Sequence, residues 1–192
     1  MLIGICGKAG AGKDTIGDYF IKHYNFQKIS LADPIKRLVK DIFVLDDHTV
    51  YDRDARELPL KDWPDWSVRK LLQYIGTELF REKIDDAIWV KSLWFRVLQN
   101  KDIDYIVSDI RFPNELSYFK DNAKDGEFFC IKVIRPGYDG KVGLVGHASE
   151  AYDLQGDVEI VNDGNIEDLH KKLDLIIKNI IIDKVKSIKG KI

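Results

Sequence analysis

Short apolar runs alternate with longer amphipathic segments along most of the chain. Apolar runs of this length predict buried strands, whereas apolar positions spaced three and four apart predict helices. Alternation of the two predicts an α/β fold, in which a mainly parallel sheet is covered by helices on both faces. The predicted strands are 2–6, 26–31, 105–108, 127–135 and 158–161, and the predicted helices are 13–24, 34–43, 67–83, 86–100, 114–124 and 166 onward.

The length of 192 residues suits one domain with an insertion. We expect a core formed by residues 1–43 and 101–192, interrupted by a helical insertion at about 44–100. Residues 44–66, at the start of this insertion, are acidic and aromatic-rich and predict an irregular connection. The last helix either packs on the sheet or pairs with a second copy in a homodimer. The lysines between 184 and 191 predict a solvated tail.

The first predicted strand runs directly into a glycine-rich loop. Such a loop, followed by a helix, turns backbone N–H groups toward an anion, and a lysine at its end reaches the terminal phosphates of a nucleotide. A glycine turn without a ligand is the alternative, but the strand before the loop and the helix after it favour a nucleoside triphosphate site. The loop consists of Gly7, Lys8, Ala9, Gly10, Ala11, Gly12 and Lys13.

The residue after the loop lysine departs from the usual pattern. Serine or threonine normally stands there and contacts Mg²⁺ through its hydroxyl, but this chain has Asp14 followed by Thr15. We expect the Asp14 carboxylate to face away from the triphosphate while its N–H still contributes, and Thr15 to supply the hydroxyl to the metal. A similar displacement occurs in small-metabolite kinases of the adenylate kinase type, which favours a kinase over a GTPase.

Polar residues follow several of the predicted strands. Because the carboxyl ends of parallel strands meet at one edge of the sheet, where ligands bind, we expect these residues to converge. Asp109 is placed to hold Mg²⁺ through water, and Arg111 with Lys13 supplies positive charge to a phosphoryl group in transfer. A structural ion pair between Asp109 and Arg111 is the alternative. Further residues expected at this edge are Asp33, Lys36, Arg135 and Asn162.

Net charge, apolar runs and cysteines indicate which kinds of partner and compartment to expect. The net charge of −2 predicts no general attraction to nucleic acid or to a membrane. The chain enters a strand at once and has no long apolar stretch, so we expect neither a signal peptide nor a membrane span. Cys6 and Cys130 lie in predicted strands, without metal-like spacing, which is typical of buried thiols in a reducing cytoplasm.

Several segments together resemble the deoxynucleoside monophosphate kinases of tailed bacteriophages and related viruses. The resemblance extends from residue 3 to about 175, and the segments 72–78 and 108–115 are its more specific parts. The matching segments read Gly-Lys-Asp-Thr at 12–15, Leu-Ala-Asp-Pro at 31–34, Leu-Gln-Tyr-Ile-Gly-Thr-Glu at 72–78, Ser-Asp-Ile-Arg-Phe-Pro-Asn-Glu at 108–115 and His-Ala-Ser-Glu at 147–150.

The resemblance implies a P-loop kinase fold with the five strands in the order 2-3-1-4-5, a monophosphate-binding insertion and a lid. It implies transfer of the γ-phosphoryl group of ATP to a deoxynucleoside 5′-monophosphate, with Mg²⁺, giving a diphosphate. If viral, such an enzyme acts in the host cytoplasm.

The predicted insertion carries the candidates for binding the acceptor monophosphate. Arginine offers two parallel N–H donors to a phosphate, which suits Arg69 and Arg81 to this role. Gln73 is placed to hydrogen-bond the base, and Asp33 to contact the sugar or the cations around the acceptor phosphate. An ordinary surface cation is the alternative for Arg69. The set expected to bind acceptor is Asp33, Lys36, Arg69, Gln73, Arg81, Arg111, His147 and Glu150.

A glycine-rich segment at 136–150 follows the fourth strand, where kinases of this class carry a lid that excludes water. Arg135 and Lys141 are its predicted contacts to the phosphates. His147 is either a substrate contact or a hinge residue. Asn162 and Gly164, after the fifth strand, are placed to border the adenine, and a turn with a helix cap is their alternative.

Two other functions stay open on the sequence alone. Dephospho-CoA kinase and adenylate kinase relatives share the phosphate loop but lack the segment at 72–78. A non-catalytic ATP-binding partner in a viral replication assembly would bind ATP without acceptor-dependent turnover.

Overall fold

The computed structural model describes residues 1–124, 126–137 and 152–189. The chain forms two compact units. The first consists of Met1–Ile29 and Trp94–Ile192, and the second of Ser30–Leu93. The second unit therefore begins earlier and ends earlier than the insertion that the sequence predicts at 44–100.

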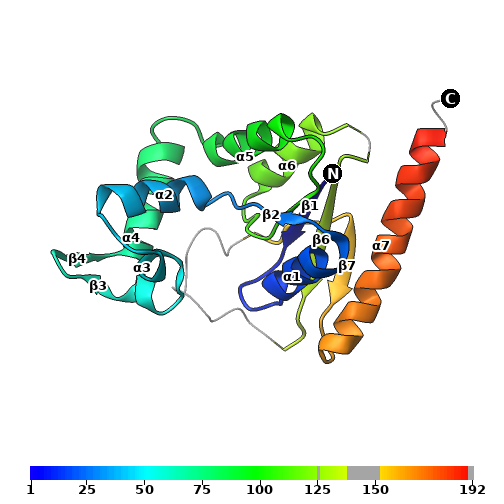
Figure 1. Ribbon diagram of the computed structural model, residues 1–192, viewed down its shortest axis with the longest axis horizontal. Helices are drawn as coiled ribbons and strands as arrows, with labels where there is room; N and C mark the ends of the chain where they lie inside the picture. Colours follow the sequence, from blue (N-terminus) through cyan, green and yellow to red (C-terminus); the bar gives the residue numbers. More distant parts are fainter. Residues whose placement is uncertain (125, 138–151, 190–192) are drawn as a thin grey trace. The chain divides into compact units, whose positions relative to one another are not determined.

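The first unit contains a five-stranded parallel sheet (Figure 1). Its strands are β1 (Leu2–Cys6), β2 (Gln27–Lys28), β5 (Tyr105–Val107), β6 (Phe128–Ile134) and β7 (Val158–Val161). The order across the sheet is β2-β5-β1-β6-β7, and every adjacent pair is parallel. This confirms the predicted α/β fold and the order 2-3-1-4-5, since β5, β6 and β7 are the third, fourth and fifth strands of the predicted set.

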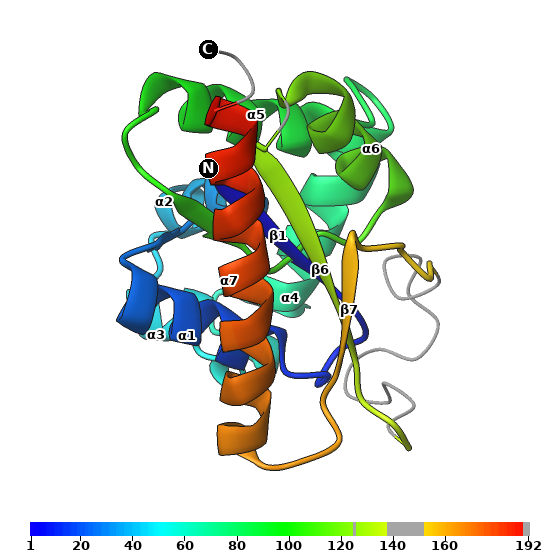
Figure 2. The same cartoon turned by 90° about the vertical axis from the view of Figure 1, so that its right-hand side faces the viewer.

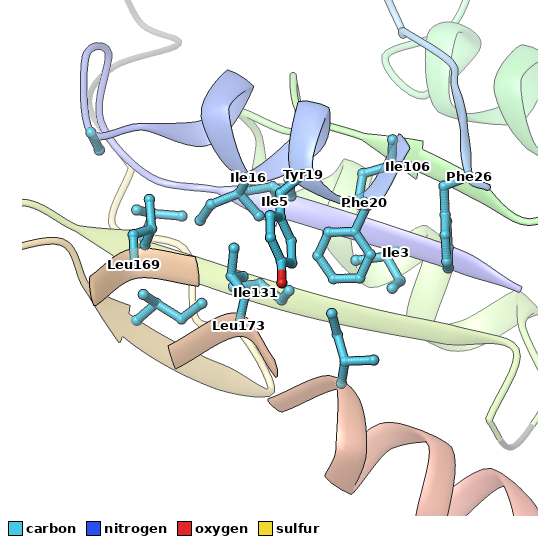
Figure 3. Packing of buried hydrophobic residues seen from close by; sticks show 14 residues of the cluster. Ile3, Ile5, Ile16, Tyr19, Phe20, Phe26, Ile106, Ile131, Leu169 and Leu173 are labelled. Carbon is cyan, nitrogen blue, oxygen red and sulfur yellow. The ribbon is translucent and has the colours of Figure 1, made fainter. Parts of the chain in front are cut away.

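Helices α1 (Lys13–Tyr24) and α7 (Ile166–Lys189) pack on one face of this sheet. Ile3 and Ile5 of β1 point into this layer, where they meet Phe20 of α1 and Leu173 of α7 (Figure 3). Each of these side chains is almost fully buried. Burial of an isoleucine, leucine or phenylalanine side chain contributes about 1.5–3 kcal/mol, so this layer fixes α1, and with it the loop that precedes α1.

Helix α6 (Pro113–Asn122) packs against β6 through Phe119, whose ring centre lies 5.1 Å from that of Phe128. Phe128 is turned away from the α1 layer, because successive side chains of a strand alternate between faces. Cys6 and Cys130 also lie outside the α1 layer, and both are free and buried, as predicted.

Helix α7 packs on the sheet through its first three turns. Leu169, Leu173 and Ile177 are buried in the core, and Figure 2 shows the helix running beside β6 and β7. The helix continues to Lys189, which confirms the predicted helix from residue 166 onward, and the solvation of the lysines between 184 and 191 stays a prediction. Among the helices that the structure describes, none combines the length and apolar character needed to cross a bilayer.

Strand β2 covers only two residues of the predicted 26–31. It is an edge strand that pairs with β5 alone, and both of its residues are exposed. Edge strands are commonly short because a long open edge invites pairing with other chains. The apolar residues that suggested a longer strand, Phe26 and Ile29, are buried on either side of it.

The second unit has more regular structure than the sequence predicts. Residues 44–66, expected to be an irregular connection, include a short helix, a 3₁₀ turn and most of an antiparallel hairpin. The hairpin turn, Lys61-Asp62, lacks the Asn-Gly or Asp-Gly pair that would have signalled it. The elements of this unit are α2 (Asp33–Ile42), α3 (Asp47–Tyr51), η1 (Ala55–Glu57), β3 (Pro59–Leu60), β4 (Trp63–Ser67), α4 (Val68–Gln73), η2 (Tyr74–Arg81) and the first part of α5 (Ile88–Gln99).

The predicted helix at 67–83 changes its winding part-way. It begins as α4, capped by the Ser67 hydroxyl, and continues as the π-helix η2. Inside η2 the carbonyl of Gly76 accepts a hydrogen bond from the buried indole of Trp89, at 2.9 Å. A Cβ at Gly76 would lie 2.9 Å from Cδ1 of Ile35, so a larger residue there would displace the end of the Ile35 side chain. Single π-helical turns are frequent at functional sites.

Helix α2 ends in a motif that normally uses glycine. The N–H of Leu45 donates to the carbonyl of Lys40 at 2.9 Å, and Val44, between the C-cap Phe43 and Leu45, has a φ of 50°. This is the Schellman arrangement, whose left-handed residue is usually glycine. A β-branched residue is poorly suited to that conformation, and Val44 is 89% exposed, so no core packing compensates for it.

We predict that Val44→Gly raises the free energy of unfolding by about 1 kcal/mol, because relief of left-handed strain (about 1–2 kcal/mol) exceeds the added entropy of glycine in the unfolded chain. Thermal or urea unfolding measures the change. Val44→Ala keeps a Cβ and should gain less than Val44→Gly. A variant with glycine that unfolds more easily than wild type would contradict the assignment of strain.

Candidate functional site

The loop between β1 and α1 is built on three glycines with positive φ. The φ angles of Gly7, Gly10 and Gly12 are 136°, 75° and 108°, a region that residues with a side chain rarely adopt. A Cβ at Gly7 would also lie 2.4 Å from the carbonyl oxygen of Val133 in β6. The loop then enters α1, whose first-turn N–H groups have no partner within the helix and favour an anion.

Lys13 places its ammonium group within this loop. The Nζ donates to the carbonyl oxygens of Gly7, at 2.7 Å, and of Lys8, at 2.8 Å. The first residue of α1 is therefore folded back over the loop that precedes it. A positive charge and a curled backbone next to a helix N-terminus form a site with the chemistry of phosphate binding.

The Asp14 carboxylate is directed toward the ends of β2 and β5. Its Oδ1 lies 3.2 Å from Nζ of Lys28 and accepts a hydrogen bond from the Ser108 hydroxyl at 3.3 Å. Desolvation raises the pKa of the Asp14 carboxylate only in part, because the side chain is largely exposed, and the ammonium of Lys28 with the hydrogen bonds from Lys28 and Ser108 lowers the pKa of Asp14 below the usual range. Asp14 is therefore a charged carboxylate that is paired with the ammonium of Lys28.

The turn after β5 carries Asp109 and Arg111 and is held by Glu115. The Glu115 side chain, only 4% exposed, accepts hydrogen bonds from the backbone N–H groups of Arg111, at 2.9 Å, and Phe112, at 3.0 Å. The carboxylate thus caps the start of α6 and fixes the backbone at Arg111. Asp109 is half-buried and the Arg111 residue is exposed.

The side chains of the residues directly after β6 and β7 reach the opposite flank of the loop. Asn162 donates from Nδ2 to the carbonyl of Ala11 at 2.9 Å, and Arg135 donates from Nη1 to that of Gly10 at 3.3 Å. Gly164 lies two residues before α7, and a Cβ there would be 2.8 Å from the Asp168 carboxylate.

Five of the predicted acceptor residues belong to the second unit. Arg69 forms an ion pair with Glu57, and Lys36 places its ammonium 5.3 Å from the centre of the Tyr51 ring. Asp33 accepts a hydrogen bond from the N–H of Ser30 at 3.1 Å. Gln73 ends α4 and Arg81 ends η2, and both are half-buried.

Comparison with known proteins identifies the family. A family model described as deoxynucleotide monophosphate kinase matches residues 52–173, more than half of the chain. The chain belongs to the deoxynucleotide monophosphate kinase family. It is therefore a phosphotransferase of the nucleotide kinase type, and the family assignment goes against dephospho-CoA kinase.

Viral members of the deoxynucleotide monophosphate kinase family are similar to this chain. A protein of Acanthamoeba polyphaga mimivirus, provisionally named deoxynucleotide monophosphate kinase, is 31% identical over 93% of this chain and 97% of its own length. The deoxynucleotide monophosphate kinase of Enterobacteria phage T4 is 34% identical over 59% of this chain, a match that spans 46% of the phage protein.

Solved structures of other kinases share the fold at low sequence identity. Shikimate kinase from Aquifex aeolicus superposes with a TM-score of 0.53 at 12% identity, covering 95% of this chain and 99% of its own. APS kinase from Mycobacterium tuberculosis gives a TM-score of 0.51 at 10% identity, covering 92% and 96%. The P-loop kinase fold is thus shared well beyond the deoxynucleotide monophosphate kinases.

Three of the residues expected at the site, Lys141, His147 and Glu150, lie outside the described residues, as does most of the predicted lid. The structure adds three that the sequence did not single out, Lys28, Ser108 and Glu115. Glu115 left a usable signal, because glutamate two residues after a proline at the first helical position is typical of a capped N-terminus. Phe112 at the cap position, in place of serine or threonine, concealed it.

The lowered pKa of Asp14 predicts a pH-dependent contribution to stability. Because the folded-state pKa lies below the unfolded value of about 3.9, Asp14 stabilises the fold above that pH, and the contribution is lost as the pH falls through the folded-state pKa. Asp14→Asn should therefore melt below wild type at pH 6–7, with the difference vanishing toward about pH 2.

Melting curves recorded from pH 7 to pH 2 measure this difference. Asp18→Asn, at an exposed aspartate of the same helix, is the matched control for the removal of one charge from α1. A difference between Asp14→Asn and wild type that stayed constant over the whole range would contradict the proposed ion pair.

Proposed function

We propose that this deoxynucleotide monophosphate kinase uses ATP and Mg²⁺ to phosphorylate deoxynucleoside 5′-monophosphates to diphosphates. The observation that carries the proposal is the loop from Gly7 to Lys13, in which three positive-φ glycines curl the backbone around the Lys13 ammonium. In a member of this family, such a loop is the expected site of the triphosphate.

The chain's residues divide the work of transfer as follows. The loop N–H groups and Lys13 hold the β- and γ-phosphates of ATP. An oxygen of the acceptor phosphate attacks the γ-phosphorus in line, the bond to the β,γ-bridging oxygen breaks, and ADP leaves. Arg111 neutralises charge on the phosphoryl oxygens during this exchange. Positioning and electrostatic stabilisation supply most of the catalysis in reactions of this kind.

The residues available for Mg²⁺ fit its chemistry. Mg²⁺ prefers oxygen ligands and is usually held by one or two carboxylates together with substrate phosphates. Thr15, in the first turn of α1, offers a hydroxyl, and Asp109, beyond β5, offers a carboxylate. When bound, the ion would neutralise charge on the β- and γ-phosphate oxygens.

The second unit is the proposed acceptor-binding part. Arg69 and Arg81 would hold the acceptor phosphate, and Gln73 would hydrogen-bond the base. The ion pair with Glu57 limits the conformations of Arg69. The π-helix η2 begins directly after Gln73 and ends at Arg81. Asp33 and Lys36 complete the proposed acceptor set in α2, and Arg135 with Lys141 the proposed lid contacts.

An assay of ADP release with Mg·ATP and dTMP, dGMP, dCMP or dAMP, each beside its ribose counterpart, tests this function. We expect turnover with one or more deoxynucleotides and weaker turnover with the matching ribonucleotides. ATP binding without turnover on any of the eight acceptors would contradict the proposal and favour a non-catalytic ATP-binding protein.

Arg111 is expected to act on the rate rather than on ATP binding. Arg111→Ala should lower kcat by roughly a hundredfold or more and leave the Kd for ATP nearly unchanged, because the guanidinium contacts charge that develops during transfer. Lys13→Ala should lower both kcat and ATP affinity. The matched control is Lys101→Ala, an exposed cation before the amino end of β5. Wild-type turnover by Arg111→Ala would overturn the role given to it.

A further inference from the structure

Asn162 sits against the phosphate loop, bound at both its backbone and its side chain. Its backbone N–H donates to the carbonyl of Ile134 at the end of β6, at 2.7 Å. Its side-chain amide donates to the carbonyl of Ala11 at 2.9 Å. The residue therefore links the end of β6 to a loop more than 100 positions away in the sequence.

The contact between Asn162 and the loop leaves no room for a side chain at Gly12. A Cβ there would lie 2.6 Å from Nδ2 of Asn162. Ala11, whose carbonyl accepts the hydrogen bond, is itself only 2% exposed. A buried carbonyl that lost this donor would be left without compensation for its desolvation.

The hydrogen bond to the Ala11 carbonyl also sets the direction of the N–H of Gly12. The carbonyl of Ala11 and the N–H of Gly12 belong to one planar trans peptide, in which they point in opposite directions. By holding the Ala11 oxygen on the β7 side, Asn162 aims the Gly12 N–H the other way. Gly12 immediately precedes Lys13, so its N–H belongs to the group of donors that a phosphate would meet.

We propose that Asn162 is a positioning residue, which orients the Gly12 N–H toward the triphosphate instead of contacting the adenine as the sequence suggested. The inference rests on the proposed function, in which this loop holds ATP. The adenine role and the positioning role differ in one respect. A residue that contacts adenine matters only for ligands with a base, whereas a residue that shapes the loop matters for any polyphosphate.

Titration calorimetry of Asn162→Ala with inorganic tripolyphosphate and with ATP, in Mg²⁺, separates the two roles. We expect both affinities to fall by a similar factor, roughly tenfold, as for the loss of one hydrogen bond to a buried group. In the kinase assay the KM for ATP should rise by a comparable factor. Asn162→Ser, too short to reach Ala11, should behave in the same way and replaces the alanine variant if that does not fold.

The matched control is Asn165→Ala. Asn165 accepts a hydrogen bond from the N–H of Asp168 at 3.0 Å and caps α7, so its loss lowers stability without touching the loop. Its tripolyphosphate affinity should equal that of wild type. Loss of ATP affinity alone in Asn162→Ala would overturn the proposal in favour of an adenine contact, and unchanged affinity for both ligands would also overturn it. Wild-type protein that bound neither ligand would refute the proposed function itself.

Discussion

The candidate site of this kinase depends on the close approach of Gly7 to β6. The backbone leaves β1 with a φ of 136°, at a distance where a Cβ would lie 2.4 Å from the Val133 oxygen. Glycine is the residue type that adopts this φ readily and has no Cβ to collide with the Val133 oxygen. If the chain turned elsewhere, Lys13 would not fold back onto Gly7, and α1 would not begin where its hydrophobic face meets Ile5 and the rest of the core.

Electrostatic balance explains how an aspartate can follow the loop lysine. A carboxylate beside a triphosphate site would repel the ligand, but the Asp14 oxygen is shared between Lys28 and Ser108. These partners come from the ends of β2 and β5, the two strands on one side of β1. The negative charge is therefore drawn to that side, while the Lys13 ammonium stays over the loop.

The sequence predicted the frame of the first unit because that frame follows from burial. The strand Leu2–Cys6 is buried on both faces and reads as a continuous apolar run, which is typical of a parallel sheet covered by helices on both sides. The second unit was harder to predict. Its hairpin has no glycine in the turn. The apolar spacing of its π-helix is also the spacing of an α-helix, and the contacts of Gly76 with Ile35 and Trp89 are visible only in the structure.

The residues of the candidate site also differ in how far the sequence could predict them. The positions of the loop glycines, Lys13 and Asp109 at the carboxyl edge of the sheet could be predicted from the sequence, because that placement follows from the strand that precedes each of them. Their roles stay predictions. Asn162 was placed at the correct edge, but sequence position alone does not determine whether an amide faces a ligand or the backbone of a loop 150 residues away.

Asn162 and Glu115 point to a common principle in this fold. Each is a polar side chain that hydrogen-bonds the backbone of a functional turn, Asn162 at Ala11 and Glu115 at Arg111 and Phe112. Phosphoryl transfer requires donors held in place before the reaction, since reorganising them during it would raise the barrier. A turn has few backbone hydrogen bonds of its own. Side chains from neighbouring elements supply the missing hydrogen bonds: Glu115 from the helix that follows its turn, and Asn162 from the residues just after β7.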